Sequence, residues 1–260
     1  MESTTTEYDY LKPYKKPVFD INAAKFHYVV KHNDLIEKAK SDLTVQEMKL
    51  VDFFISRIKP TDNKFAEINV TLNDLAKVLN LTRSGKNYLN IANSLRSLRR
   101  KEIIIKSDDK MTITGWLATV TISRGGDVSA FISSELTPYL LELKDKGHYT
   151  QYLLNDIVQL NSKYSIALYK LIRLEHGKHG SKPSIDKYQT LVASIEEWRD
   201  IFEAPEAYST SIFMRNCVKR AINEINLKID DLRIDKPGYK KNGHRIVEMR
   251  LNVVNGIGEL

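Results

Sequence analysis

The sequence has little cysteine and no long apolar run. Cys217 is the one cysteine among 260 residues, which excludes an intramolecular disulfide and a zinc site built from several thiolates. No apolar stretch approaches the roughly 20 residues that a membrane-spanning helix needs, and residues 1–16 are polar and rich in tyrosine, unlike a secretion signal. We therefore expect no membrane partner and a reducing, cytoplasmic location.

Charge, by contrast, is abundant and unbalanced. The chain carries 40 basic and 33 acidic side chains, a formal net charge of +7, while 42% of its residues are hydrophobic. This composition is typical of a globular chain that buries a core, and its length suggests one large domain or two small ones. The basic excess favours a nucleic-acid partner, although many other proteins share it.

A regular order of elements begins after a polar arm that we predict to be flexible over residues 1–28. Thr44 and Glu47 have the spacing of a capping box, and apolar residues then recur at helical intervals until Pro60. A short strand over 65–70 and two helices follow, the first capped by Thr71. Strands over 103–106 and 111–122 then form a predicted hairpin.

The same order returns in the second half of the chain. A helix over 162–176 is followed by a second capping-box spacing at Ser194 and Glu197, and then by a helix over 209–228. A hairpin of residues 232–235 and 245–253 ends the unit. The sequence therefore predicts an α+β fold of two tandem winged-helix domains related by internal duplication, the first over 29–150 and the second over 151–260, each with its third helix suited to the major groove of DNA.

In both units the predicted third helix has an apolar stripe on one side and basic and amide side chains on the other. The last hairpin of the chain has further basic residues. Arg bonds guanine and Asn bonds adenine bidentately, so these are residue types of major-groove readout, and hairpin cations suit phosphates. A solvated helix face or a soluble turn would have similar residues. In the first unit the predicted DNA-binding residues are Lys86, Asn90, Asn93, Arg96, Ser97 and Arg100. In the second they are Ser209, Thr210 and Ser211 at the helix start, Arg215, Asn216, Lys219, Arg220 and Asn223 along the helix, and Lys240, Lys241 and Arg245, beside Lys236 and His244, in the hairpin.

Three segments resemble a known family. They are Leu136-Thr-Pro-Tyr-Leu-Leu-Glu-Leu143, Tyr164-Ser-Ile-Ala-Leu-Tyr-Lys-Leu-Ile172 and Phe213-Met-Arg-Asn-Cys-Val-Lys-Arg-Ala-Ile-Asn-Glu-Ile-Asn226. Over residues 29–253 the chain resembles the initiator replication (Rep) proteins of iteron-bearing, theta-replicating bacterial plasmids. Its general sequence character is most similar to that of the initiators of lactic-acid-bacterial plasmids.

The resemblance implies a DNA-binding protein without enzymatic activity. Family members bind directly repeated double-stranded origin DNA as monomers through two winged-helix domains, and their dimers often repress their own promoter. The helix around Arg215, Lys219, Arg220 and Asn223 would read one part of a repeat. The first unit would dock on a neighbouring part and supply the dimer surface. Origin opening and recruitment of the host replication initiator and replicative helicase machinery are implied in the same way.

The residues offer little support for an enzyme. His176 and His179 stand in a glycine-rich turn rather than in a metal motif, no phosphate-binding loop of the G-x-x-x-x-G-K-[ST] type is present, and Cys217 lies on an apolar helix face. We expect no catalytic residue, metal or cofactor. Two alternatives stay open: a dimeric winged-helix repressor that binds an inverted repeat, and a module that binds only proteins.

Overall fold

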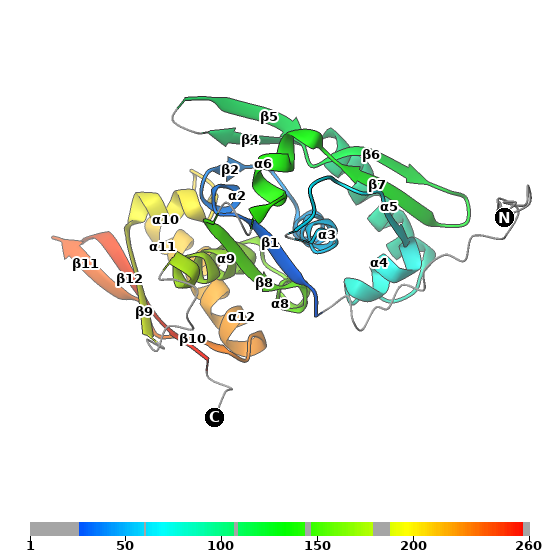
Figure 1. Cartoon of the computed structure of the whole chain (residues 1–260). Coiled ribbons are helices and arrows are strands. Elements are labelled where there is room, and N and C mark those ends of the chain that lie inside the picture. The colour runs from blue at the N-terminus through cyan, green and yellow to red at the C-terminus, as the bar shows by residue number, and fades with distance from the viewer. Residues whose placement is uncertain (1–25, 60, 107–108, 144–146, 179–187, 257–260) are drawn as a thin grey trace, which may run out of the picture.

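The computed structural model describes residues 26–59, 61–106, 109–143, 147–178 and 188–256. Most of the predicted N-terminal arm, together with His179, lies outside these residues. The chain forms an elongated α+β molecule in which the first half of the sequence occupies one end and the second half the other (Figure 1). Among the described residues, no helix is both long and apolar enough to cross a membrane.

The first half contains three helices of a winged-helix unit and several short antiparallel sheets. Its helices are α2 (Asp34–Glu37), α3 (Val45–Ile55), α4 (Leu72–Val78), α5 (Gly85–Arg100), the 3-10 turn η2 (Ser134–Leu136), α6 (Thr137–Leu140) and α8 (Leu154–Gln159). Its strands are β1 (Tyr28–His32), β2 (Ala39–Lys40), β3 (Ile68–Thr71), β4 (Glu102–Lys106), β5 (Met111–Gly115), β6 (Leu117–Ile122), β7 (Asp127–Ile132) and β8 (Tyr149–Leu153). The sheets have the orders β2-β4-β5 and β3-β7-β6, and β1 pairs with β8.

Local sequence signals account for the starts of these helices. The capping box predicted at α3 is confirmed: Thr44 Oγ1 accepts a hydrogen bond from the Glu47 N–H at 3.3 Å, and Glu47 Oε2 accepts one from the Thr44 N–H at 2.7 Å. Thr71 caps α4 as predicted, by accepting a bond from the Asp74 N–H.

The predicted strand over 111–122 is wrong, because the chain changes sheets at Trp116. This side chain is 7% exposed and its indole N–H donates to Ser41 Oγ at 3.2 Å, which anchors the chain between the two sheets. Residues before Trp116 form β5 and pair with β4, whereas residues after it form β6 and pair with the unpredicted strand β7.

The second half repeats the arrangement with one continuous sheet. Its helical segments are α9 (Lys163–Lys178), α10 (Ile195–Ile201), α11 (Thr210–Phe213), the π-helical turn η3 (Met214–Lys219) and α12 (Arg220–Lys228), and its strands are β9 (Tyr188–Ser194), β10 (Leu232–Ile234), β11 (Gly238–Asn242) and β12 (Arg245–Asn255). The capping box at Ser194 is confirmed. The predicted hairpin is wrong in part: β10 pairs with the far end of β12, and β11, predicted as the turn, pairs with its start. The eleven-residue β12 is long enough to hold both strands along one edge.

Strand register shows how the two halves correspond. In the first half, the helix-capping Thr71 pairs with Asp127, and in the second half the helix-capping Ser194 pairs with Glu248. The strand before the second helix thus pairs in each half with the last strand of a hairpin. The wing of the first unit is therefore β6–β7, equivalent to β11–β12, and β4–β5 is an additional hairpin.

The long helix α9 joins the halves, because it packs on β8 on one side and on α12 on the other. The predicted division between residues 150 and 151 falls inside β8, whose residues on both sides of that point pair with β1. Asp52, buried on α3, lies 3.0 Å from Lys31 Nζ on β1 and 2.7 Å from Lys170 Nζ on α9. Tyr152 on β8 donates a hydrogen bond to the same carboxylate at 3.1 Å. Four elements thus meet at one buried charge cluster.

Candidate nucleic-acid interface

Helix α5 presents a polar, basic face to solvent because its apolar residues are buried in the core on the opposite side. Ile91, Leu95 and Leu98 are fully buried. Ser84 caps the helix start by accepting a hydrogen bond from the Asn87 N–H at 3.2 Å. Of the residues predicted for this face, five are exposed: Lys86, Asn90, Asn93, Arg96 and Arg100.

Ser97 is the exception among the residues predicted on α5. Its side chain is half-buried and hydrogen-bonds the carboxylate of Glu47 on α3. Burial alone would raise the pKa of Glu47, but hydrogen bonds from Lys101 and Ser97 outweigh burial and lower it. Ser97 therefore holds α5 against α3, a role that the helical projection did not indicate.

The third helix of the second unit runs from α11 through η3 to α12. Its inner side is made of buried apolar residues, among them Phe213, Val218 and Ile225, and Cys217 is buried with them as predicted. Burial raises the pKa of the Cys217 thiol, so the thiol stays protonated. The outer side exposes Ser211, Arg215, Lys219, Arg220 and Asn223.

Two details distinguish the start of this helix. Ser209 Oγ accepts a hydrogen bond from the Ile212 N–H at 3.3 Å, so the Ser209 hydroxyl caps the helix. Of the two residues that follow, Thr210 is half-buried and Ser211 is exposed. Within the π-helical turn, Arg215 Nε donates to Asn216 Oδ1 at 3.1 Å. This bond orients the guanidinium of one predicted base-reading residue through the amide of the next.

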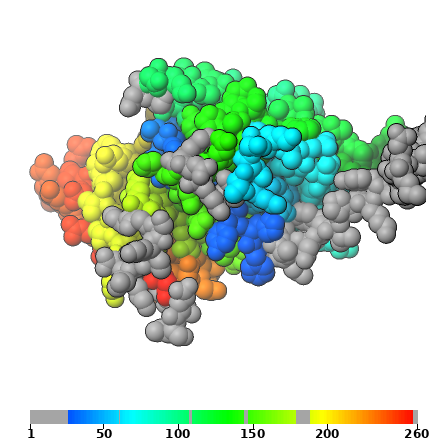
Figure 2. Space-filling model, in the orientation of Figure 1, coloured from blue at the N-terminus to red at the C-terminus, as the bar shows by residue number. Residues whose placement is uncertain are grey.

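Both wings project beyond the helices, at opposite ends of the molecule (Figures 1 and 2). In the second wing, Lys240, Lys241, His244 and Arg245 are exposed near Gly243, which turns with a φ of +60°, and Lys236 is exposed ahead of β11. A bulge between Lys240 and Lys241 shifts the register, which increases the local twist of the hairpin.

The first wing has a cation that sequence reasoning missed. Its turn is closed by bonds between Ser123 and Asp127, by the Gly126 N–H donating to the Ser123 carbonyl, and by a φ of +83° at Gly126. Arg124 is exposed at this tip. The signal was the Gly125-Gly126 pair ahead of an alternating segment, which is a hairpin pattern that a continuous 111–122 strand obscured.

The comparison with protein-family models decides the family. A model described as the initiator replication protein WH1 domain matches residues 28–173, more than half of the chain, and one described as the initiator Rep protein WH2 domain matches residues 194–253. The chain belongs to the initiator replication protein family. Its fold is two winged-helix domains, as predicted. The first match ends within α9, and the second begins at the last residue of β9.

One solved structure, at a TM-score of 0.69, has the same fold as this chain. A crystal structure described as the Pi initiator protein in complex with iteron DNA has a TM-score of 0.69 and 19% sequence identity, covering 89% of this chain and 98% of that one. A structure of domains 2 and 3 of RctB has a TM-score of 0.48 and 11% identity, covering 85% of this chain and 86% of that one. A search of curated proteins finds no match.

Contacts between the two domains hold α12 in place. Glu224 on α12 accepts hydrogen bonds from the N–H groups of Asn161 at 2.8 Å and Ser162 at 3.1 Å, in the turn that leads into α9. Lys228 on the same helix donates to the Gln159 carbonyl at 2.7 Å. The orientation of α12 is therefore set by the chain between α8 and α9.

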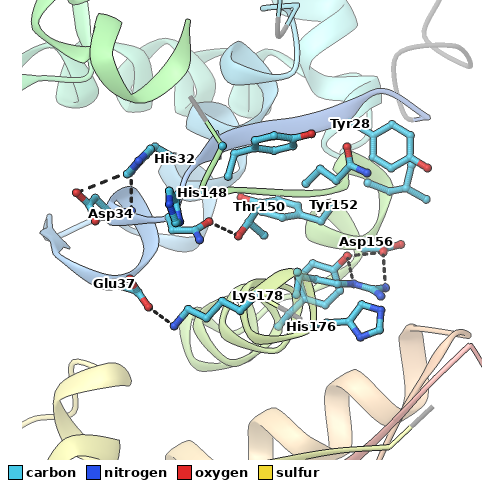
Figure 3. A pocket seen from close by; sticks show the side chains of 18 of the residues that line it. Tyr28, His32, Asp34, Glu37, His148, Thr150, Tyr152, Asp156, His176 and Lys178 are labelled. Carbon is cyan, nitrogen blue, oxygen red and sulfur yellow. Dashed lines mark hydrogen bonds and ion pairs between the residues drawn. The ribbon is translucent and has the colours of Figure 1, made fainter. Parts of the chain in front are cut away.

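A pocket of about 1060 Å³ lies beside this junction, between β1, α2, β8 and α9 (Figure 3). Its polar lining groups bond to one another: Thr150 Oγ1 donates to Asn33 Oδ1 at 2.8 Å, and Lys178 Nζ lies 2.5 Å from Glu37 Oε1. His176 also lines it; its predicted place in a glycine-rich turn is wrong, because α9 continues through His176 to Lys178. Among the described residues, no group of three or more His, Cys, Asp or Glu side chains is arranged to hold a metal ion. The Lys178–Glu37 pair across this pocket ties α9 to α2.

Proposed function

We propose that this protein initiates plasmid replication by binding directly repeated double-stranded origin sequences through its two winged-helix domains. One observation carries the proposal: both third helices expose a row of basic and amide side chains at equivalent places in two winged-helix domains of an initiator family. The Pi initiator, whose fold is similar, is described in complex with iteron DNA, which supports the same class of ligand here.

Specificity and affinity come from different residues in this proposal. On α5 the amides and guanidiniums of Asn90, Asn93 and Arg96 read base edges, and Arg215 and Asn223 do so on the second helix. The wing cations Lys240, Lys241 and Arg245, together with Ser209 to Ser211 at the helix start, hold phosphates. Arg124 gives the first wing the same role.

The later steps follow from several bound copies. Adjacent protein molecules bend and destabilise A·T-rich DNA beside the repeats, and the opened origin receives the host replication initiator and the replicative helicase machinery. A dimer of the same chain represses its own promoter. The protein acts in the cytoplasm, without a cofactor or a catalytic residue, and its source is a plasmid of the lactic-acid-bacterial type.

The test is selection of bound duplexes from fragments of the plasmid or genome that encodes the chain, followed by footprinting and stoichiometry at two salt concentrations. We expect protection of adjacent direct repeats with one protein per repeat. Protection only of an inverted repeat by a dimer would replace the initiator with a repressor, and no specific protection would favour a module that binds only proteins.

A further inference from the structure

Leu89 is an apolar residue in the exposed stripe of α5. Counting along the helix, the stripe consists of Lys86, Leu89, Asn93, Arg96 and Arg100, whose successive spacings of three and four residues place them on one side. Leu89 is 62% exposed, whereas Leu95 and Leu98 of the same helix are fully buried. The helix thus already packs through its opposite side, and Leu89 adds nothing to the core.

Single exposed leucines are common on protein surfaces, so position is what distinguishes this one. Leu89 begins the second turn of α5, and the two side chains just before it are bonded within the protein: Asn87 Nδ2 donates to the Thr82 carbonyl at 2.8 Å, and Tyr88 OH donates to Asn73 Oδ1 at 3.2 Å. A helical side chain leans toward the helix start, which is the part of a recognition helix that contacts base edges.

The major groove offers one kind of apolar group, the C5 methyl of thymine, among hydrogen-bond donors and acceptors. A leucine side chain has neither donor nor acceptor, so thymine suits it, whereas cytosine would set an N4 donor and no methyl group against it. We propose that Leu89 makes the first winged-helix domain select thymine at one position of its DNA site, by contact with the methyl group. This inference rests on the proposed function and names one base of the site.

The test uses a duplex recovered from a random-sequence library with the full chain, in which each thymine in turn is replaced by deoxyuracil. This replacement removes only the methyl group. At one thymine we expect the replacement to weaken binding of the unsubstituted protein about fourfold, the factor for burying one methyl-sized group. Leu89→Ala should bind the unmodified duplex about fourfold more weakly and should not distinguish thymine from deoxyuracil at that position.

Leu227→Ala is the matched control, because Leu227 is 80% exposed but lies in the last turn of α12. It should keep the sensitivity to deoxyuracil at the position that Leu89 reads. Both substitutions exchange one good helix former for another at an exposed position, so circular dichroism and urea unfolding should match the unsubstituted protein.

The outcomes separate two failures. If the full chain selects a duplex but deoxyuracil has no effect at any thymine, or if Leu89→Ala keeps the full effect at every thymine, the thymine contact is refuted while DNA binding stands. If the full chain selects no duplex, the proposed function fails and the thymine contact fails with it.

Discussion

Arg173 Nη2 on α9 lies 2.7 Å from both carboxylate oxygens of Asp231, 58 residues further along the chain. The guanidinium also donates from Nε to Tyr169 OH at 3.1 Å, and Tyr169 OH donates to Asp156 at 2.6 Å. Asp231 follows α12, so this chain of bonds joins α9, the helix that packs against both halves, to the end of α12.

Removing Arg173 should destabilise the packing between α9 and the segment that follows α12. Arg173→Gln leaves the half-buried Asp156 without its cation. We expect the free energy of unfolding to fall by about 1–3 kcal/mol. The lower part of this range is favoured because Asp231, the other partner of Arg173, is partly exposed. Urea unfolding measures the loss. Lys77→Gln, which breaks the surface pair with Asp74, is the control and should cost about 0.5 kcal/mol or less. Equal losses would contradict a structural role for Arg173.

The free energy of unfolding should increase with pH because of the buried Lys31. The pKa of Lys31 is lowered to about 7, against 10.5 for an exposed lysine, because burial, with a smaller contribution from the charge of Lys170, outweighs the opposing attraction of Asp52. Above pH 7 the folded lysine loses its proton while the unfolded one keeps it until about pH 10.5, so the unfolded state binds more protons and the free energy of unfolding increases with pH, by up to about 1.4 kcal/mol per unit between pH 8 and 10.

The Lys31→Met variant isolates this contribution. Asp52 keeps Lys170 at 2.7 Å, and Lys49, whose pKa is lowered by burial to about 8, contributes a slope of the same sign in both proteins. We expect urea unfolding at several pH values to give a flatter profile for the variant. The same slope in both proteins would mean that Lys31 stays protonated beside Asp52.

Arg215 should contribute to specificity rather than to general affinity. Its guanidinium is exposed on the π-helical turn and oriented by Asn216, so Arg215→Ala should weaken binding to the selected duplex by about 1–3 kcal/mol and barely change binding to random DNA. Titration of both duplexes by fluorescence anisotropy distinguishes these effects. An equal loss on the two DNAs would place Arg215 among the phosphate contacts.

Lys240 should contribute to general affinity. Because it is exposed beside the turn of the second wing, Lys240→Ala should weaken binding to all DNA similarly and reduce the slope of log K against log salt by about one. Lys178→Ala is the control, since that ammonium is paired with Glu37 and Glu175, and its slope should not change. An unaltered slope for Lys240→Ala would remove this wing from the interface.

Glu224 should position the second recognition helix without touching DNA. Glu224→Ala leaves the N–H groups of Asn161 and Ser162 without their acceptor, so we expect a loss of about 1–2 kcal/mol in unfolding and weaker binding to the selected duplex. Glu224→Gln, which keeps an acceptor oxygen, should restore part of both. Full stability and affinity in Glu224→Ala, as expected for the exposed control Glu206→Ala, would argue against this role.

Signals within a few residues determined much of this protein from sequence alone. Helical spacing along the chain accounts for the capping boxes at Thr44 and Ser194, the buried side of the helix around Cys217 and the exposed rows on both third helices. The order of the predicted elements indicated two winged helices. Helix periodicity fixes which side of a helix is apolar before any partner is known.

Contacts between distant residues were decided only by the tertiary structure. The alternation of residues 111–122 fits one strand, and only the burial of Trp116 against Ser41 divides it between two sheets. Ser97 bonds Glu47 across 50 residues and Arg173 bonds Asp231 across 58, and neither pair has a local signal. Strand partners and ion pairs depend on how the packed helices bring distant segments together, and residue spacing along the chain does not contain that information.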